Sequence, residues 1–431
     1  MFDFPDTAGI QAAIAPAVDA LGPAARVERL GNSHAGAAID LISIGQGDCS
    51  ILVVAGPHAN EPLGCLAIIS LINDLAHGRV PGGISDFSWH FIPVIDPDGL
   101  DLNSGWLRGP ATLQSYMRHF FRPAFSRQAE YGFPLEMPGY RFDAPSPENI
   151  CWQRALEISR PDLQVSLHGS DTGGAFFILS EDRPGLAPRL SRAAKGSGLG
   201  LNRHGEPEAT MRSYAPGVFS AFEVQAFIKE ATAAGREGKD VWTAGQSSSE
   251  FAMRNYASLC LVSEVPLWHD TREANRRASS FTMRDAAYWQ WTEAVEDGRL
   301  LERAADLLAL DQEAAEDAAL CLALREAAAL APSAVNAANH SLQTADGTVR
   351  LRVADLVHVE PGTAMMRTAA MLARFAQRRG AVDLAAAARS LLDDRMARYL
   401  QSAKLQPAPV ARAVSLQRDA ILAAAGSVMR G

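Results

Sequence analysis

Short, continuous apolar runs that alternate with helical patterns are the feature that most limits how this chain can fold. Four such runs resemble buried strands, at residues 48–55, 87–95, 162–167 and 258–265. A helical pattern over residues 63–75 follows the first run. Continuous apolar strands spaced by helices are typical of a mixed or largely parallel sheet covered on both faces. We therefore expect an α/β fold, with a twisted mixed β-sheet flanked by helices.

The last third of the chain has a different composition. Beyond about Asp285 the residues Ala, Leu, Glu and Arg dominate, and apolar residues have helical spacing over residues 300–331 and 363–400. An Asp-Gly pair within residues 342–355 predicts a β-hairpin in that region. We therefore expect two parts: an α/β domain over residues 1–290, and a mainly α-helical C-terminal domain or extension over residues 291–431.

Composition excludes several classes of protein. A net charge of −9 opposes nucleic-acid binding through a generally basic surface. We see no apolar run that approaches the ~18–20 residues needed to cross a bilayer, so we expect no membrane span. The five cysteines are widely spaced without a C-x-x-C pair, which argues against a disulfide framework. The N-terminus has no basic start followed by an apolar core, so the simplest expectation is a cytoplasmic protein.

A polar motif joins the first predicted strand to the helix that follows it. Residues 56–64 spell GPHANEPLG, in which His58 and Glu61 lie three positions apart. Imidazole nitrogen and carboxylate oxygen are good zinc ligands, and a turn could direct both side chains to one point. A simpler reading also stays open: a turn histidine, and a glutamate that complements the dipole of the helix. Taken alone, this spacing favours the simpler reading.

Two further strands change that balance. His168 follows the run at residues 162–167, and Glu264 lies at the end of the run at residues 258–265. Ligands of open α/β sheets gather outside the carboxyl ends of the strands. A catalytic zinc usually takes three protein ligands and a water. Two histidines and one glutamate would supply the ligands, and the second glutamate could move the proton of the attacking water.

At this point the sequence resembles the zinc carboxypeptidase family, of carboxypeptidase A type, whose superfamily includes the desuccinylases and aspartoacylases. The 56–64 motif resembles the family's G-x-H-x-x-E zinc motif, and its Asn-Glu also resembles the H-G-N-E of the deacylase branch. The segment IDPDGL resembles the N-P-D-G turn, with Asp96 in place of Asn. The strand SLHGSD resembles the one that carries the third ligand, and residues 245–265 resemble the segment leading to the catalytic glutamate. The resemblance covers about residues 40–270.

The resemblance implies a fold, a cofactor and roles for four residues. The fold would be phosphorylase/hydrolase-like, as in other zinc peptidases of this type. His58, Glu61 and His168 would bind one zinc ion per chain, and Glu264 would act as general base and acid.

The resemblance also implies two arginines that act on the substrate. Arg108 falls where the family keeps an arginine that polarises the scissile carbonyl. Arg122 falls where an Asn-Arg pair grips the substrate carboxylate, a task suited to the fork of a guanidinium. The Asn of that pair is replaced by Phe121, so Arg118 is a second candidate for this role.

Three more residues of the matched region are candidates for substrate binding. Trp242 stands near the position where digestive members carry a tyrosine over the substrate. Ser249 lies where a residue lines the side-chain pocket, and Glu250 has the spacing to Glu264 that the family segment has.

The function that these residues favour is hydrolysis of an amide bond by a zinc metallopeptidase. We expect a metallocarboxypeptidase that releases the C-terminal residue of a small or unusual peptide. One alternative is a zinc-dependent N-acyl-amino-acid deacylase, and another is an inactive metal-bound protein that binds peptides. In each case the expected partner is a peptide or an acyl-amino acid, with no nucleic acid and no membrane.

Overall fold

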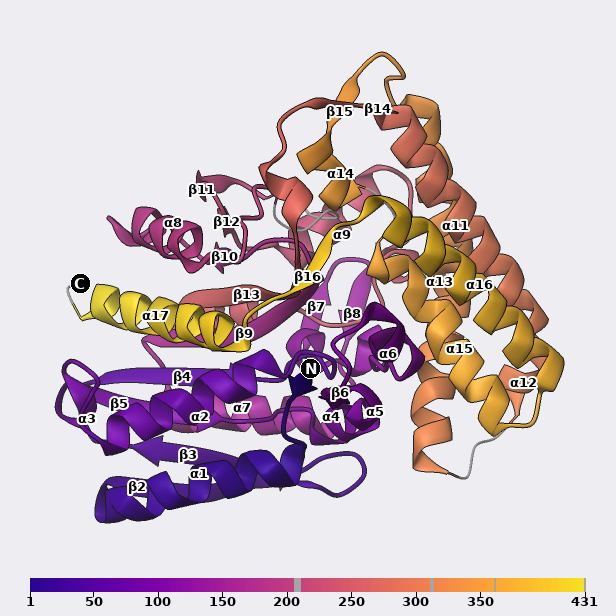
Figure 1. Cartoon of the computed structure of the whole chain (residues 1–431). Coiled ribbons are helices and arrows are strands. Elements are labelled where there is room, and N and C mark those ends of the chain that lie inside the picture. Colours follow the sequence, from indigo (N-terminus) through magenta and orange to yellow (C-terminus); the bar gives the residue numbers. More distant parts are fainter. Residues whose placement is uncertain (205–210, 311–313, 360–361, 430–431) are drawn as a thin grey trace.

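A ten-stranded mixed sheet forms the centre of the molecule, as the computed structural model shows in Figure 1. The structure describes residues 1–204, 211–310, 314–359 and 362–429. Nine strands follow one another across the sheet, and β16 (Leu405–Pro407) pairs with β13 outside that path. In spatial order the nine are β11 (Ser213–Ala215), β12 (Val218–Ser220), β10 (Phe176–Leu179), β13 (Leu259–Asp270), β9 (Leu163–Thr172), β4 (Cys49–Ala55), β5 (Phe87–Ile92), β3 (Ala38–Ile44) and β2 (Ala25–Asn32).

The middle of the sheet is parallel and its outer strands are mostly antiparallel. Strands β5, β4, β9 and β13 run in the same direction, whereas β3 and β10 run against their inner neighbours. The predicted α/β fold with a mixed sheet is therefore confirmed. Two strands run longer than predicted: β9 ends at Thr172 and β13 at Asp270. His168 and Glu264 consequently lie inside their strands.

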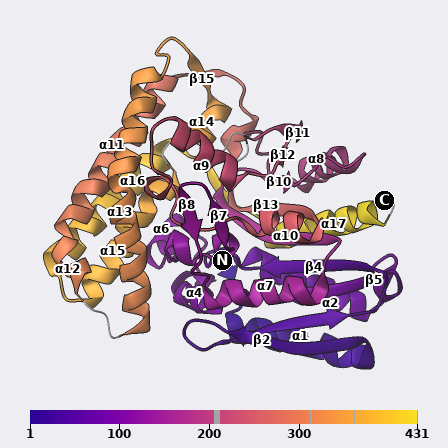
Figure 2. The ribbon, with the colours of Figure 1, turned by 180° about the vertical axis from the view of Figure 1, so that it is seen from behind.

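Helices cover both faces of the sheet, as Figures 1 and 2 show. One face is covered by α1 (Thr7–Leu21), α2 (Leu63–Ala76), α8 (Leu186–Ser197) and α17 (Val410–Val428), and the other by α7 (Pro147–Ser159) and α10 (Ser248–Tyr256). Helix α2 lies very close to β9, because a Cβ added at Gly64 would be 2.6 Å from the Cβ of Leu167. This contact places the start of α2 directly over the strand that carries His168.

A group of helices stands beside the sheet, on the right in Figure 1. We call this group the helical layer; it comprises α11 (Met283–Arg303), α12 (Ala305–Ala309), α13 (Ala315–Thr344), α14 (Val353–Val359), α15 (Arg367–Arg378) and α16 (Val382–Ser402). The chain then leaves the layer, and α17 packs on β13, β9 and α2. The division into residues 1–290 and 291–431 stays a prediction, and α17 lies with the sheet.

The β-hairpin predicted within residues 342–355 is wrong. Helix α13 continues to Thr344, and the only strand in that region, β15 (Arg350–Arg352), pairs with β14 (Ala278–Thr282). The Asp-Gly pair, Asp346 and Gly347, forms a turn between a helix and a strand. The partner strand therefore comes from some 70 residues earlier in the chain, so no local pattern could indicate it.

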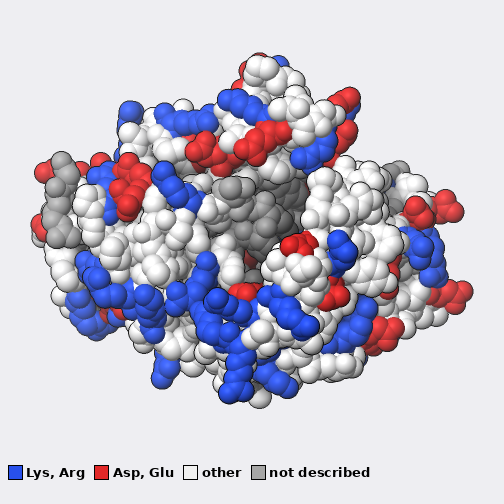
Figure 3. All heavy atoms as spheres, turned by 90° about the horizontal axis from the view of Figure 1, so that it is seen from above, with Lys and Arg blue, Asp and Glu red and all other residues white. Residues whose placement is uncertain are grey.

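The sequence predicts no membrane span and no nucleic-acid binding, and two features of the structure concern these predictions. In the described part of the chain, α13 alone is long and apolar enough to cross a membrane, and 22% of its best 18-residue window is buried. A single such helix is weak support for a span, because helices of soluble proteins pass the same test. Lys and Arg side chains gather in the lower half of the face drawn in Figure 3, despite the negative net charge. That the protein binds neither membranes nor nucleic acids therefore stays a prediction.

Candidate active site

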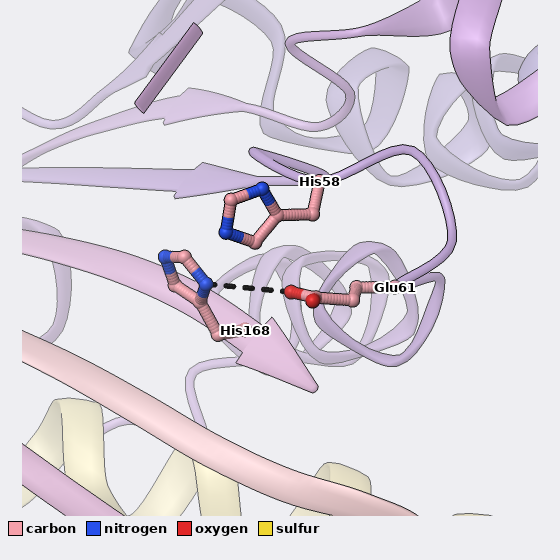
Figure 4. Close-up of side chains that lie close together, drawn as sticks. All are labelled: His58, Glu61 and His168. Carbon is pink, nitrogen blue, oxygen red and sulfur yellow. Dashed lines mark ion pairs between the residues drawn. The ribbon is translucent and has the colours of Figure 1, made fainter. Parts of the chain in front are cut away.

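The loop between β4 and α2 brings His58 and Glu61 to the same side. The backbone N–H of Glu61 donates to the carbonyl of His58 at 3.1 Å, which closes a tight turn between the two residues. Both side chains are buried. Figure 4 shows them directed toward His168, which projects from the neighbouring strand β9.

The loop after β4 and the neighbouring parallel strands β9 and β13 carry the four polar residues that the sequence singles out. His168 on β9 and Glu264 on β13 are direct neighbours in the sheet. The Nδ1 atom of His168 lies 3.3 Å from Oε2 of Glu61 and 3.6 Å from Oε1 of Glu264. The imidazole rings of His58 and His168 have their centroids 4.8 Å apart. The structure therefore brings His58, Glu61, His168 and Glu264 together, as the sequence predicts.

The three predicted ligands fit a zinc ion. One ligand atom from each of His58, Glu61 and His168 lies within 4.8 Å of the others. The buried Nδ1 of His58 has no hydrogen-bond partner among the described residues. Burial lowers the pKa of His58 well below its usual range, and the charges of Arg122 and His168 lower it further. A neutral imidazole is the form that binds metal, and two histidines with a carboxylate are typical of catalytic zinc.

Glu130 is a site residue that the sequence analysis missed. Its Oε2 lies 3.4 Å from Nε2 of His168 and accepts the hydroxyl of Ser166 at 2.8 Å, while Ser248 donates to its other oxygen. Burial alone would lower the pKa of His168, but bonds to Glu130 and Glu61 and the charge of Glu264 raise it well above its usual range. A carboxylate on the far nitrogen of a ligand histidine orients the ring. No motif surrounds Glu130, so the sequence offered no signal for it.

Arg122 lies beside the predicted ligands. Its Nη2 donates to Glu61 and its Nε donates to Oδ1 of Asn60 at 3.0 Å. The side chain is 18% exposed, so it is largely buried beside Glu61. The second candidate, Arg118, is exposed and lines a different surface pocket together with Arg374. Of these two arginines, the structure brings only Arg122 to the site.

Arg108 and Glu250 have partners other than the predicted ligands. Arg108 is 59% exposed, and its Nη2 lies 3.8 Å from a carboxylate oxygen of Asp6. The short strands β1 (Phe2–Asp3) and β6 (Arg108–Gly109) pair there, which draws the N-terminal segment to this arginine. Glu250 caps α10, because its carboxylate accepts the backbone N–H of Ser247.

Trp242 and Ser249 contact residues other than the predicted zinc ligands. The ring of Tyr131 stacks on His58 at 6.3 Å, and Trp242 packs edge-on against Tyr131 at 5.6 Å. Trp242 therefore packs on Tyr131, and Tyr131 in turn lies next to the predicted ligand His58. Ser249 is buried in the first turn of α10, where its carbonyl accepts the thiol of Cys260.

The fold and the site define a class: an α/β protein with a buried His-Glu-His site and a neighbouring glutamate, as in zinc hydrolases. Residues 15–117 match the family model of the zinc carboxypeptidases. This match confirms the resemblance to that family and supports a metallopeptidase that uses zinc. The matched segment contains His58 and Glu61 and ends before Arg122, His168 and Glu264.

Several solved structures are similar to part of the chain. A metallo-carboxypeptidase from Burkholderia cenocepacia is 19% identical over 59% of this chain and 59% of its own, with a TM-score of 0.37. Carboxypeptidase A from Helicoverpa armigera is 15% identical over 62% of this chain and 66% of its own, with a TM-score of 0.41. A metallo-carboxypeptidase from Pseudomonas aeruginosa is 20% identical over 62% and 61%, with a TM-score of 0.37. This chain thus spans less than two-thirds of each of these three. No curated protein matches it.

Proposed function

We propose that the protein is a zinc metallocarboxypeptidase that releases the C-terminal residue of a peptide. The observation that carries this proposal is the position of Arg122, which donates to the predicted ligand Glu61 and whose side chain is 18% exposed. A cation fixed next to the hydrolytic centre would hold a free carboxylate close to the scissile bond. The last peptide bond of a chain always has a free carboxylate at that distance.

The proton transfers are assigned to Glu264. When bound, zinc polarises a carbonyl and lowers the pKa of a coordinated water toward ~7. Glu264, on the strand next to His168, would take the proton of the attacking water and return it to the leaving amine. Its carboxylate is close enough for this task, since Oε1 lies 3.6 Å from the Nδ1 atom of a predicted ligand.

Arg122 would bind the substrate carboxylate through paired N–H donors. A guanidinium matches a carboxylate in a bidentate geometry, and such charge-assisted bonds are stronger than neutral ones. Its Nε and Nη2 already contact Asn60 and Glu61, which fix the direction of the side chain. The donors directed away from these two residues would meet the substrate.

The test compares one peptide substrate with its C-terminal amide. Loss of a charge-assisted pair should cost ~1.5–3 kcal/mol, or about one to two powers of ten in kcat/KM. The Arg122→Ala variant should cleave the two forms at similar rates. The matched control is Arg118→Ala, which should keep the full preference because Arg118 lines another pocket. Equal cleavage of the acid and the amide by the parent protein would refute the carboxypeptidase proposal.

A further inference from the structure

The helical layer reaches the candidate site through one arginine. Arg367, the first residue of α15, donates from Nη2 to Oδ2 of Asp171 at 3.0 Å. Its guanidinium also lies over the ring of Phe120, 5.3 Å from the ring centroid. Asp171 is on β9, three residues beyond the predicted ligand His168. An ion pair between residues 196 positions apart therefore joins the layer to the strand of the site.

A chain of hydrogen bonds runs from Asp171 to a predicted zinc ligand. The other oxygen of Asp171 accepts the hydroxyl of Tyr116 at 2.5 Å and the amide of Asn60 at 3.3 Å. The same Asn60 amide donates to Tyr116 at 2.8 Å, and its carbonyl oxygen accepts Nε of Arg122 at 3.0 Å. Arg122 in turn donates to Glu61. Each member of the chain thus has its orientation set by the one before it.

The chain of hydrogen bonds depends on Arg367 because its members are buried. Asn60 is fully buried and Asp171 is 4% exposed, so neither can replace a lost partner with bulk water. Burial raises the pKa of Asp171, but Arg367, Tyr116 and Arg122 together hold it below its usual value. A buried carboxylate that loses its cation becomes protonated or moves to another partner. Either change would disturb the amide of Asn60.

Three further hydrogen bonds connect the helical layer to the rest of the protein near the site. Tyr399 of α16 donates to the hydroxyl of Thr172 at 3.4 Å, next to Asp171. The carboxylate of Glu326 on α13 accepts the backbone N–H of Ser126, at 3.2 Å, in the segment that follows Arg122. Arg374 of α15 donates to the carbonyl of His119 at 3.0 Å. The helical layer therefore contacts β9 next to Asp171 and also the segment around Arg122. These are the two regions that the chain of hydrogen bonds joins.

We propose that Arg367 is a positioning residue: it acts through Asp171 and Asn60 to hold Arg122 against the zinc ligand Glu61. The helical layer is then part of the active-site structure. The effect on substrate carboxylates rests on the proposed function of Arg122, whereas the effect on Glu61 does not.

The test is a double-mutant cycle read on zinc affinity, measured by competition with a chelator. Partners of metal ligands typically contribute about 10- to 100-fold to metal affinity. We expect Arg122→Ala and Arg367→Ala each to weaken zinc binding by about tenfold or more. The double variant should bind zinc no more weakly than Arg122→Ala alone, because both changes break the same chain. The control is Arg389→Ala, an exposed residue of the layer that contacts Gln377, and it should match the parent.

Two further variants guard against a folding defect. Arg367→Lys keeps a charge beside Asp171 and should restore part of the zinc affinity, and Asp171→Asn should reproduce the loss in a nearly isosteric side chain. Parent-like zinc affinity in Arg367→Ala would overturn the proposal. Fully additive losses in the double variant would do the same.

A second measurement separates this proposal from the proposed function. With zinc in saturating excess, Arg367→Ala should raise KM for a carboxylate substrate by about tenfold with little change in kcat, and KM for the C-terminal amide should stay close to that of the parent. If the parent does not prefer the acid, the carboxypeptidase proposal fails, and the zinc cycle still decides the role of Arg367. If Arg122→Ala removes the preference for the acid but Arg367→Ala does not, only the positioning proposal fails.

Discussion

Glu264→Gln is expected to keep its zinc and to lose nearly all turnover. The amide has almost the same shape as the carboxylate but cannot accept a proton from the attacking water. General base catalysis contributes typically ~10²–10⁴-fold, so kcat should fall by at least about a hundredfold. The predicted ligands remain, because Glu264 is outside the His58, Glu61 and His168 group. Zinc content and kcat should be measured on the same preparation.

The control for this variant is Glu157→Gln, an exposed residue of α7, which should behave as the parent does. A loss of less than about tenfold in Glu264→Gln would remove Glu264 from the role of general base. Loss of the zinc along with the activity would assign it instead to metal binding.

His168→Ala is expected to abolish most zinc binding in a folded protein. Catalytic zinc usually has three protein ligands, and this variant leaves only the pair His58 and Glu61 from one loop. The metal content of the purified variant, measured after dialysis, should fall from about one zinc per chain to a small fraction. His77→Ala is the matched control, because His77 is an exposed histidine at the end of α2.

The His168 experiment also distinguishes a structural from a metal-binding role. Circular dichroism should show a cooperative thermal transition in both histidine variants, since the parallel strands around His168 are held by their own apolar side chains. An unchanged zinc content in His168→Ala would exclude this residue as a ligand.

The central strands and the four clustered polar residues could be predicted because their signals are local. An unbroken apolar run such as residues 51–55 is typical of a strand buried on both faces. Polar residues toward the carboxyl ends of parallel strands meet at one edge. For this reason His58, Glu61, His168 and Glu264 could be grouped before their strand order was known.

The remaining features depend on contacts between distant parts of the chain. Glu130 approaches His168 from a loop without a motif, and Arg367 reaches Asp171 across 196 positions. Arg108 has the expected place in the sequence, yet pairing of the two-residue strands β1 and β6 places it beside Asp6 at the surface. Such short strands have no periodicity to detect, because alternation needs about four residues to be recognised.

The most direct test of the proposed function is a digest of a peptide library with mass detection, run with zinc and with a chelator. We predict the loss of one C-terminal residue from peptides that end in a free carboxylate, and no loss once the zinc is removed. N-acyl-amino acids in the same mixture should stay intact. Cleavage at internal bonds, release of acyl groups, or no zinc-dependent change in mass would contradict the proposal that this protein is a metallocarboxypeptidase.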